Sequence, residues 1–303
     1  MYEKDFKIAV ILFVYNRPEH TERVLEGLRK NNIDKLYIFS DGLKKEEHYE
    51  GFKKVRTIIN DIDWCKCTLH LHENNLGLAK SVIFGVTKVL EENDAVIVLE
   101  DDCVPTQKFY YYMRECLTKY KDEKKVMHVT GGAIPLSNKN DEDIYFYPYP
   151  GSWGWGTWKD RWVKFEDNTE EYRKLLNNRQ ARKNFGKPGS IFVEFLDKQL
   201  KGEVDSWLIR WYYTIYKNQG LCIWPFNSYI ENIGFDGSGV HKVKSNKFEV
   251  KPNYKSNEQI IFPTNYKVDR KIISEFRMLF HDSSFPEKLK SKIKKLKRKV
   301  YGS

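Results

Sequence analysis

Apolar and polar residues alternate in blocks along the first 130 residues of the chain. A near-continuous apolar run at 7–15, "KIAVILFVY", predicts a strand that is covered on both faces. The next segment, 16–31, places a proline early, acids in its first half and bases in its second, which predicts a helix. The alternation continues with strands predicted at 35–41, 67–73, 95–101 and 125–132 and helices at 44–61, 77–93 and 107–120. This order predicts an α/β fold with a doubly wound, mostly parallel central sheet.

The pattern changes after about residue 140. Seven of the eight tryptophans lie between 153 and 224, and the regular alternation fades. The sequence contains no repeat, low-complexity linker or clear boundary. We therefore expect one continuous domain over 1–245 with halves of about 1–130 and 131–245, followed by a C-terminal extension at 246–286 and a basic tail at 287–303.

The net charge of +10 is concentrated in that tail. Residues 287–303 hold eight Lys or Arg against one Glu, so the other 286 residues together carry only +3. Leu289, Ile293, Leu296 and Val300 fall on one helical stripe, which predicts a basic amphipathic helix on an anionic membrane surface; a solvated basic tail is the alternative. The charges are not interleaved with base-stacking aromatic residues, so no nucleic-acid partner is expected.

Composition indicates a folded protein of a reducing compartment. Apolar residues make up 41% of the chain and aromatic residues 15%, and no apolar run approaches the ~18 residues of a membrane span. The five cysteines are an odd number without framework spacing, and the N-terminus lacks the features of a secretory signal. We expect a cytoplasmic protein, peripheral on the inner face of a bacterial membrane through its tail.

Polar side chains follow four of the predicted strands at the points where they end. Because ligands of doubly wound sheets bind at the carboxyl ends of the strands, these residues predict a nucleotide site. They are Tyr15, Asn16 and Arg17 after the first strand, Asp41 after the second, Asn75 after the third, and Glu100, Asp101 and Asp102 after the fourth.

Three adjacent carboxylates after a buried strand repel one another and need compensation. The sequence has no GxGxxG after its first strand and no GxxxxGK[ST], so a diphosphate needs another source of positive charge. A divalent cation, Mn²⁺ or Mg²⁺, held by one or two of the acids would supply it. The alternative interpretation is a cap cluster for the helix that follows.

The segment "VIVLEDDCVPTQKFYYYM" at 96–113 resembles the DxD-type segment of GT-A glycosyltransferases. Its EDD form is similar to that of the protein O-mannose and N-glycan β-1,2-N-acetylglucosaminyltransferases and of bacterial family-2-like sugar transferases. Further segments resemble the family in order over about 8–242: "FVYNRPEHTERVLEGL", "IFSDG", "ENNLGLAKSVIFGV", "YPGSWGWGTWKDRW", "EVDSWLIRW" and "CIWPFNSYIENIGFDGSGVH".

The resemblance implies a GT-A fold, with a nucleotide-binding half at 1–130 and an acceptor-side half at 131–245. Asp102 would ligate the metal, Asp101 would contact the ribose or a metal-bound water, and Glu100 would face the sugar or support the loop. Because imidazole is a common ligand, His241 is expected at the metal or the pyrophosphate, with a surface loop histidine as the alternative. Asp205 would be the base that deprotonates an acceptor hydroxyl; a helix cap is its alternative role. The remaining donor-binding residues expected are Tyr15, Asn16, Arg17, Asp41, Asn75, Lys80, Ser81 and Trp155.

The sequence thus predicts a metal-dependent, inverting transferase that moves a sugar, with GlcNAc or another hexose expected, from a nucleotide-diphosphate donor. UDP is the nucleotide that the resemblance favours, and the acceptor expected is a glycan, lipid-linked saccharide or polysaccharide. A sugar-phosphate nucleotidyltransferase is a second hypothesis, although "VYNRPEHTE" lacks the Gly-rich basic loop of that class. A non-catalytic carbohydrate- or membrane-binding module that uses the tryptophans and the tail is a third.

Overall fold

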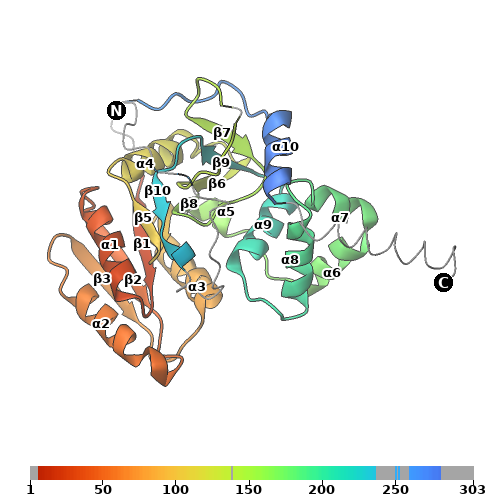
Figure 1. Ribbon diagram of the computed structural model, residues 1–303. Helices are drawn as coiled ribbons and strands as arrows, with labels where there is room; N and C mark the ends of the chain where they lie inside the picture. The colour runs from red at the N-terminus through yellow and green to blue at the C-terminus, as the bar shows by residue number, and fades with distance from the viewer. Residues whose placement is uncertain (1–5, 138, 237–249, 251, 253–258, 281–303) are drawn as a thin grey trace, which may run out of the picture.

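The computed structural model describes residues 6–137, 139–236, 250, 252 and 259–280. Helices and strands alternate regularly in the first half and mix with several consecutive helices in the second (Figure 1). In chain order the elements are β1 (Ile8–Val14), α1 (Pro18–Arg29), β2 (Lys35–Ser40), η1 (Glu46–His48), α2 (Tyr49–Asn60), β3 (Lys66–Leu71), α3 (Leu78–Leu90), β4 (Ala95–Glu100), β5 (Cys103–Pro105), α4 (Phe109–Lys119), β6 (Val126–Thr130), β7 (Ile144–Tyr147), β8 (Trp155–Trp158), α5 (Lys159–Trp162), α6 (Thr169–Asn177), α7 (Arg179–Phe185), α8 (Ile191–Leu200), α9 (Trp207–Lys217), β9 (Leu221–Pro225), β10 (Ile230–Asn232), η2 (Gly234–Asp236) and α10 (Arg270–Leu279).

The described residues form an eight-stranded central sheet in the order β3-β2-β1-β4-β8-β6-β9-β7. The pairs β3–β2, β2–β1, β1–β4 and β6–β9 are parallel, whereas β8 and β7 run antiparallel to their neighbours. The short strands β5 and β10 pair as a separate antiparallel ribbon. The expected α/β architecture with a mostly parallel sheet is therefore confirmed.

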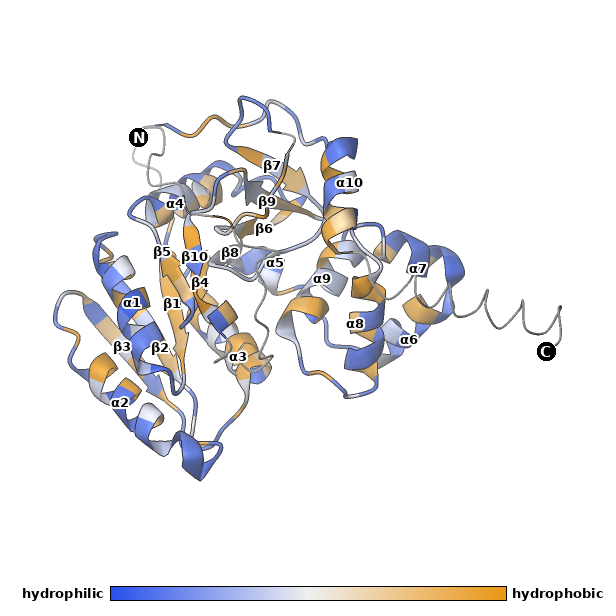
Figure 2. Cartoon of the chain, in the orientation of Figure 1, coloured by the Kyte–Doolittle hydropathy of each residue, from blue (hydrophilic) through white to orange (hydrophobic). Residues whose placement is uncertain are grey.

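Alternate residues of β1 enter two separate hydrophobic cores, because successive side chains of a strand point to opposite faces. Ala9, Ile11 and Phe13 pack in the core that α3 and α9 cover. Val10, Leu12 and Val14 pack in the core beneath α1, α2 and α4. Figure 2 shows the apolar strands enclosed between helices whose outer faces are hydrophilic. This double coverage explains the near-continuous apolar run of β1.

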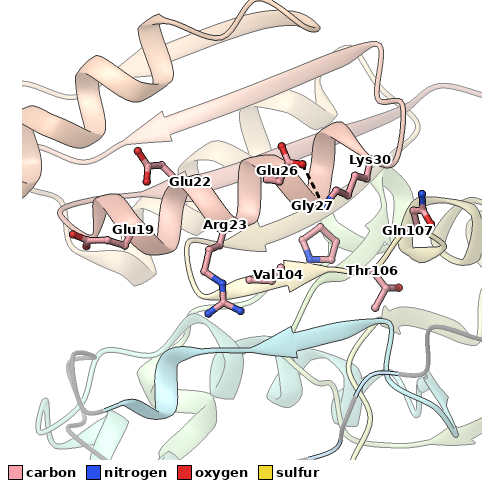
Figure 3. A pocket seen from close by; sticks show the side chains of 10 residues that line it. Glu19, Glu22, Arg23, Glu26, Gly27, Lys30, Val104, Thr106 and Gln107 are labelled. Atoms are coloured by element: carbon pink, nitrogen blue, oxygen red, sulfur yellow. Dashed lines mark ion pairs between the residues drawn. The ribbon is translucent and has the colours of Figure 1, made fainter.

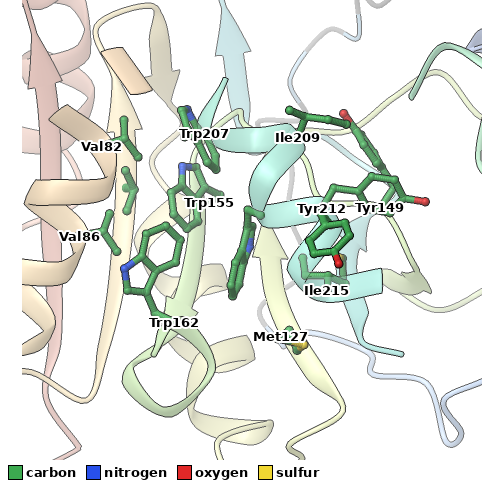
Figure 4. Close-up of a cluster of buried hydrophobic side chains, with 14 of the residues drawn as sticks. Val82, Val86, Met127, Tyr149, Trp155, Trp162, Trp207, Ile209, Tyr212 and Ile215 are labelled. Carbon is green, nitrogen blue, oxygen red and sulfur yellow. The ribbon is translucent and has the colours of Figure 1, made fainter. Parts of the chain in front are cut away.

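Trp155, Trp162 and Trp207 pack together at the junction between the sheet and α9 (Figure 4). Trp155 stacks on Trp207 with ring centroids 4.6 Å apart and on the imidazole of His128 at 5.3 Å. His128 is fully buried, and its two hydrogen bonds fit a neutral imidazole. Nε2 donates to the carbonyl of Gly151 (2.9 Å), and Nδ1 accepts from the indole of Trp211 (3.1 Å). Burial lowers the pKa of His128 to about 3.

The described part of the predicted extension packs onto the second half of the sheet. Phe276 of α10 is fully buried and stacks on Tyr147 of β7 with centroids 3.7 Å apart. Asp143 ties residue 261 to the start of β7, because its backbone N–H donates to the Ile261 carbonyl (2.9 Å) and its carboxylate accepts from the Ile261 N–H (2.8 Å).

The tail at 287–303 lies outside the described residues. In the described part of the chain, none of the helices has the length and apolar character that a membrane crossing requires.

The predicted strands and helices of the first half all form, with ends that differ by a few residues. The interpretation of the three acids as a helix cap is wrong. A turn at 101–102 leads into β5, and α4 begins only at Phe109, with Lys108 at its cap position. The acids therefore need another source of compensation.

Candidate functional site

The carboxyl ends of β1 and β4 meet at one edge of the sheet, because the two strands are parallel neighbours. Arg17 occupies the cap position of α1 directly after β1, and Asp101 and Asp102 form the turn after β4. The guanidinium of Arg17 bridges both carboxylates. Its Nε donates to Asp101 Oδ2 (3.2 Å), and its Nη2 donates to Asp101 Oδ1 and to Asp102 Oδ2 (3.0 Å). A cation of the chain itself thus compensates the acids.

This cluster is largely withdrawn from water. The side chains of Arg17, Asp101 and Asp102 are 18%, 9% and 19% exposed. Burial acts to lower the pKa of Arg17, but the two carboxylates outweigh it and raise the pKa above its usual value. Burial also raises the pKa of Asp101, and Arg17 opposes that shift. The guanidinium is therefore charged, and its Nη1 is buried without a hydrogen-bond partner in the part of the chain that the structure describes.

Glu100 differs from the two aspartates. Burial, followed by the charges of Asp102 and Asp101, raises the pKa of Glu100 to about 8. A carboxyl with this pKa is mostly protonated at neutral pH, which removes one of the three charges from the triplet. The indole of Trp207 donates a hydrogen bond to it. Glu100 consequently faces the start of α9 rather than Arg17.

The segment after β10 closes over Asp102. The N–H of Ile233 donates to the Asp102 carbonyl (2.9 Å), and Gly234 packs against the carboxylate so closely that a Cβ there would lie 2.4 Å from Oδ2. Asp236 lies 3.3 Å from Nε2 of His20 on α1. These contacts bring residues 233–236 close to the acids and to the start of α1. His241, the expected second metal ligand, lies outside the described residues.

Asp41 holds a neighbouring loop at the same edge. Its Oδ1 accepts from the N–H groups of Gly42 (2.9 Å) and Leu76 (2.8 Å), and its Oδ2 accepts from Gly77 (2.8 Å). Asn75 donates to the Gly42 carbonyl (2.7 Å). Gly77 has φ +78°, a left-handed conformation that favours glycine at the start of α3. The carboxylate thus fixes the loop between β3 and α3.

Four other expected donor-binding residues surround these two groups. The Tyr15 hydroxyl accepts from the Lys44 N–H (2.8 Å) and bonds Nδ1 of His48 (2.9 Å), which orients the loop after β2. Asn16 is half-buried under the start of α2. Lys80 is exposed in the first turn of α3, and the adjacent Ser81 is buried with a hydroxyl that has no partner among the described residues.

Asp205 precedes α9, whose first residue, Trp207, bonds Glu100. The interpretation of Asp205 as the helix cap is wrong, since the hydroxyl of Ser206 accepts from Ile209 N–H (3.4 Å) in that role. The Asp205 side chain is 51% exposed and forms an ion pair with Arg210 through Oδ1 only. Its Oδ2 has no hydrogen-bond partner in the described chain, so one carboxylate oxygen remains available to a ligand.

Trp155 is not at the surface of this site. Its side chain is 0% exposed and is covered by Trp207, His128 and Trp162. Direct stacking of Trp155 on a substrate is incompatible with this burial. Trp207, which was not among the expected site residues, stacks on Trp155 and bonds Glu100.

Two further residues that sequence reasoning missed also shape the site. Gly234 is identified only by its packing against Asp102, for which the sequence holds no signal. Arg210 lies in α9, whereas its partner Asp205 lies before that helix begins, so no helical spacing in the sequence indicates the ion pair. The pairing matters because it fixes the position of the Asp205 carboxylate.

A hard divalent cation fits the acids by chemistry. Asp102 is the more exposed aspartate and offers carboxylate oxygens, which Mg²⁺ and Mn²⁺ prefer. Within the described ranges, no group of three His, Cys, Asp or Glu side chains is placed to hold a metal ion. An ion here would therefore depend on one or two carboxylates together with phosphate oxygens of a ligand.

A groove of about 750 Å³ lies on the other side of α1, between this helix and β5 (Figure 3). Three of its charged side chains form ion pairs: Glu26 with Lys30 (3.3 Å) and Arg23 with Glu231 (3.2 Å). The groove does not include Arg17, Asp101 or Asp102. We therefore place the candidate site at the acids and not in this groove.

No protein-family model matches the sequence, and no curated protein is significantly similar to it. Among solved structures, TarS 1–349 of S. aureus aligns over 74% of this chain and 59% of its own with 11% identity and a TM-score of 0.42. The mannosyltransferase PcManGT from Pyrobaculum calidifontis, in complex with GDP-Man and Mn²⁺, aligns over 72% and 74% with 9% identity and a TM-score of 0.38. An apo UDP-glucose pyrophosphorylase aligns over 75% and 93% with 12% identity and a TM-score of 0.38. This chain thus spans less than two thirds of the TarS chain.

Proposed function

We propose that this protein is a metal-dependent, inverting glycosyltransferase of the GT-A type that uses a nucleotide-diphosphate sugar. One observation carries the proposal: Arg17 bridges Asp101 and Asp102 at the carboxyl edge of the sheet, with Nη1 buried and unpartnered. Ligands of doubly wound sheets bind at this edge. A guanidinium with a free N–H and an adjacent pair of carboxylates is suited to a diphosphate and its counter-ion.

The residues divide between leaving-group and acceptor roles. Asp102 would hold the cation, with Arg17 donating from Nη1 to a phosphate oxygen. The bound Mn²⁺ or Mg²⁺ would act as a Lewis acid that neutralises the departing nucleoside diphosphate. Asp41 and Asn75 fix the loop against which the nucleoside would rest. His241 remains a proposed second ligand.

On the acceptor side, Asp205 is the proposed base. Its free Oδ2 would accept the proton of the attacking hydroxyl while Arg210 fixes the carboxylate through Oδ1. Glu100 connects the two sides, because it is the last residue of β4 and bonds the first residue of α9. In-line attack with Asp205 as base would invert the anomeric configuration.

The test is release of nucleoside diphosphate from a panel of UDP-, GDP- and dTDP-sugars, with and without Mn²⁺. Asp102→Asn is compared with the control variant Asp63→Asn. Asp63 is an exposed aspartate before the first residue of β3, at the end of that strand away from the candidate site. We expect metal-dependent release from at least one donor, lost in the first variant and kept in the second. Pyrophosphate-dependent formation of a nucleoside triphosphate would instead indicate a nucleotidyltransferase, and binding of donor without turnover would indicate a non-catalytic module.

A further inference from the structure

The short helix α7 has a basic face that is open to solvent. Arg182 and Lys183 follow Arg179 by three and four positions, which places the three side chains on one side of the helix, and all three are exposed. The other side packs inward, because Phe185 is fully buried and its ring lies 4.4 Å from that of Tyr212 on α9, centroid to centroid. This packing fixes the helix with its three bases outward.

Acidic residues do not offset this charge within the surrounding segment. Residues 172–193 contain six Lys or Arg and no Asp or Glu. Lys174 pairs with Glu171 (2.7 Å), whereas the other five form no ion pair with a carboxylate among the residues that the structure describes. These five exposed bases are Arg173, Arg179, Arg182, Lys183 and Lys187. Their charge is therefore available to an anionic partner.

The C-terminal tail follows from a point beside this helix. Phe280, the last described residue before the tail, packs on Phe192 with ring centroids 5.2 Å apart. It also lies against Gly189, where a Cβ would be 2.5 Å from the Phe280 carbonyl oxygen. Figure 1 shows α10 ending at the helices α7 and α8. Residues 281–286 span at most ~25 Å, so the eight Lys or Arg of 287–303 begin close to the basic face of α7.

Apolar side chains accompany the bases in this part of the molecule. Ile191 at the start of α8 is 42% exposed, and Met278 in the last turn of α10 is 69% exposed. The sequence of the tail adds one helical stripe of Leu289, Ile293, Leu296 and Val300. A soluble polyanion offers no apolar phase to such side chains, whereas the interface of a bilayer accommodates both them and the bases around them. The combination favours a membrane surface as the partner.

The basic face is separate from the acids of the candidate site. The Tyr216 hydroxyl donates to the Ala181 carbonyl (3.2 Å), so α7 packs along the second half of α9. Trp207, which bonds Glu100, is the first residue of α9 and lies roughly 14 Å away along the helix at about 1.5 Å per residue. Figure 1 shows α6 and α7 on the opposite side of the molecule from α1 and α2. Binding at α7 therefore does not involve the acids.

We propose that α7 and the tail together bind this protein to an anionic phospholipid membrane, with Arg179, Arg182 and Lys183 against the lipid phosphates. The sequence predicts the tail alone as the membrane-binding element; the folded face of α7 is a second one. Each basic residue near such a surface strengthens binding roughly fivefold, and two weak sites on one chain reinforce each other. The proposal does not depend on transferase activity.

The test is co-sedimentation of the full chain with vesicles of phosphatidylcholine alone and of equimolar phosphatidylcholine and phosphatidylglycerol. We expect binding to the anionic vesicles only, and weaker binding as the salt concentration rises. The triple variant Arg179→Gln/Arg182→Gln/Lys183→Gln should bind on the order of 10²-fold more weakly.

The control variant Lys53→Gln/Lys54→Gln/Lys66→Gln removes the same charge from exposed lysines of α2 and β3, and it should bind nearly as tightly as the wild type. Both triple variants change exposed side chains only, so their melting temperatures should match that of the wild type. Asp102→Asn should bind the vesicles like the wild type.

Ile191→Ser tests the apolar part of the surface, with inorganic polyphosphate as the soluble comparator. The variant should weaken vesicle binding severalfold and leave polyphosphate binding unchanged. The proposal is overturned if the anionic vesicles are not bound or if the two triple variants bind equally well. It is also overturned if polyphosphate binds as tightly as the vesicles and Ile191→Ser changes neither affinity, because that result would indicate a soluble polyanion as the partner.

Discussion

Replacement of Arg17 by methionine removes the cation that bridges Asp101 and Asp102 while keeping a long apolar stem. Breaking a buried ion pair by removing one partner costs about 3–5 kcal/mol. Because Arg17 and Asp102 are 18% and 19% exposed, water compensates part of the loss, and we expect the lower end, about 3 kcal/mol. For a chain of this size that corresponds to a fall in melting temperature of roughly 6 °C.

The assay is urea denaturation, with thermal denaturation as a second readout. Arg23→Met is the matched control on the same helix, since Arg23 and Glu231 are 52% and 41% exposed and such surface pairs contribute about 0–1 kcal/mol. Adding Asp102→Asn to Arg17→Met should recover part of the stability by removing one unpaired charge. Mn²⁺ at millimolar concentration should stabilise Arg17→Met more than the wild type. Equal stability of Arg17→Met and Arg23→Met would refute the reasoning.

Three further changes test other parts of the structure. The pKa of His128 in the folded protein, about 3, lies below its value in the unfolded chain, so the unfolded chain binds more protons. The free energy of unfolding should therefore fall as the pH drops below about 6.5, by up to ~1.4 kcal/mol per pH unit. Urea titrations of His128→Gln at several pH values should lack this contribution to the dependence of stability on pH. Gly234→Ala should displace the Asp102 carboxylate, costing about 1–3 kcal/mol of stability and weakening Mn²⁺ binding measured by calorimetry; unchanged metal affinity would contradict the contact. Asp205→Asn should lower kcat by about 10²–10⁴ with unchanged melting temperature, whereas Glu203→Gln should retain activity.

The strands and helices of the first half could be predicted because their signals are local. The apolar run of β1, the proline at the start of α1 and the acid triplet after β4 each report a property of a few consecutive residues. Parallel pairing then brings the strand ends together without further information. The position of the candidate site therefore follows from the sequence.

The contacts inside the site could not be predicted, because they join residues far apart in the chain. Arg17 and Asp101 are separated by 84 positions, and Gly234 reaches Asp102 only through the β5–β10 ribbon. The sequence also does not reveal which buried tryptophan contacts the acids. Trp155 and Trp207 look equivalent in sequence, yet Trp155 is enclosed by the sheet and Trp207 contacts Glu100.

The three acids at the end of β4 and in the turn after it differ in what would be lost if a metal ion approached. Glu100 is mostly protonated at neutral pH and bonded to Trp207, so it offers little charge. Asp101 binds Arg17 through both carboxylate oxygens, and a cation there would have to break two hydrogen bonds. Asp102 shares a single contact with Arg17, at 3.0 Å, and is the more exposed aspartate. An incoming cation would therefore displace Arg17 from Asp102 while Asp101 still holds the guanidinium, so Asp102 is the acid that would hold an ion at the lowest cost.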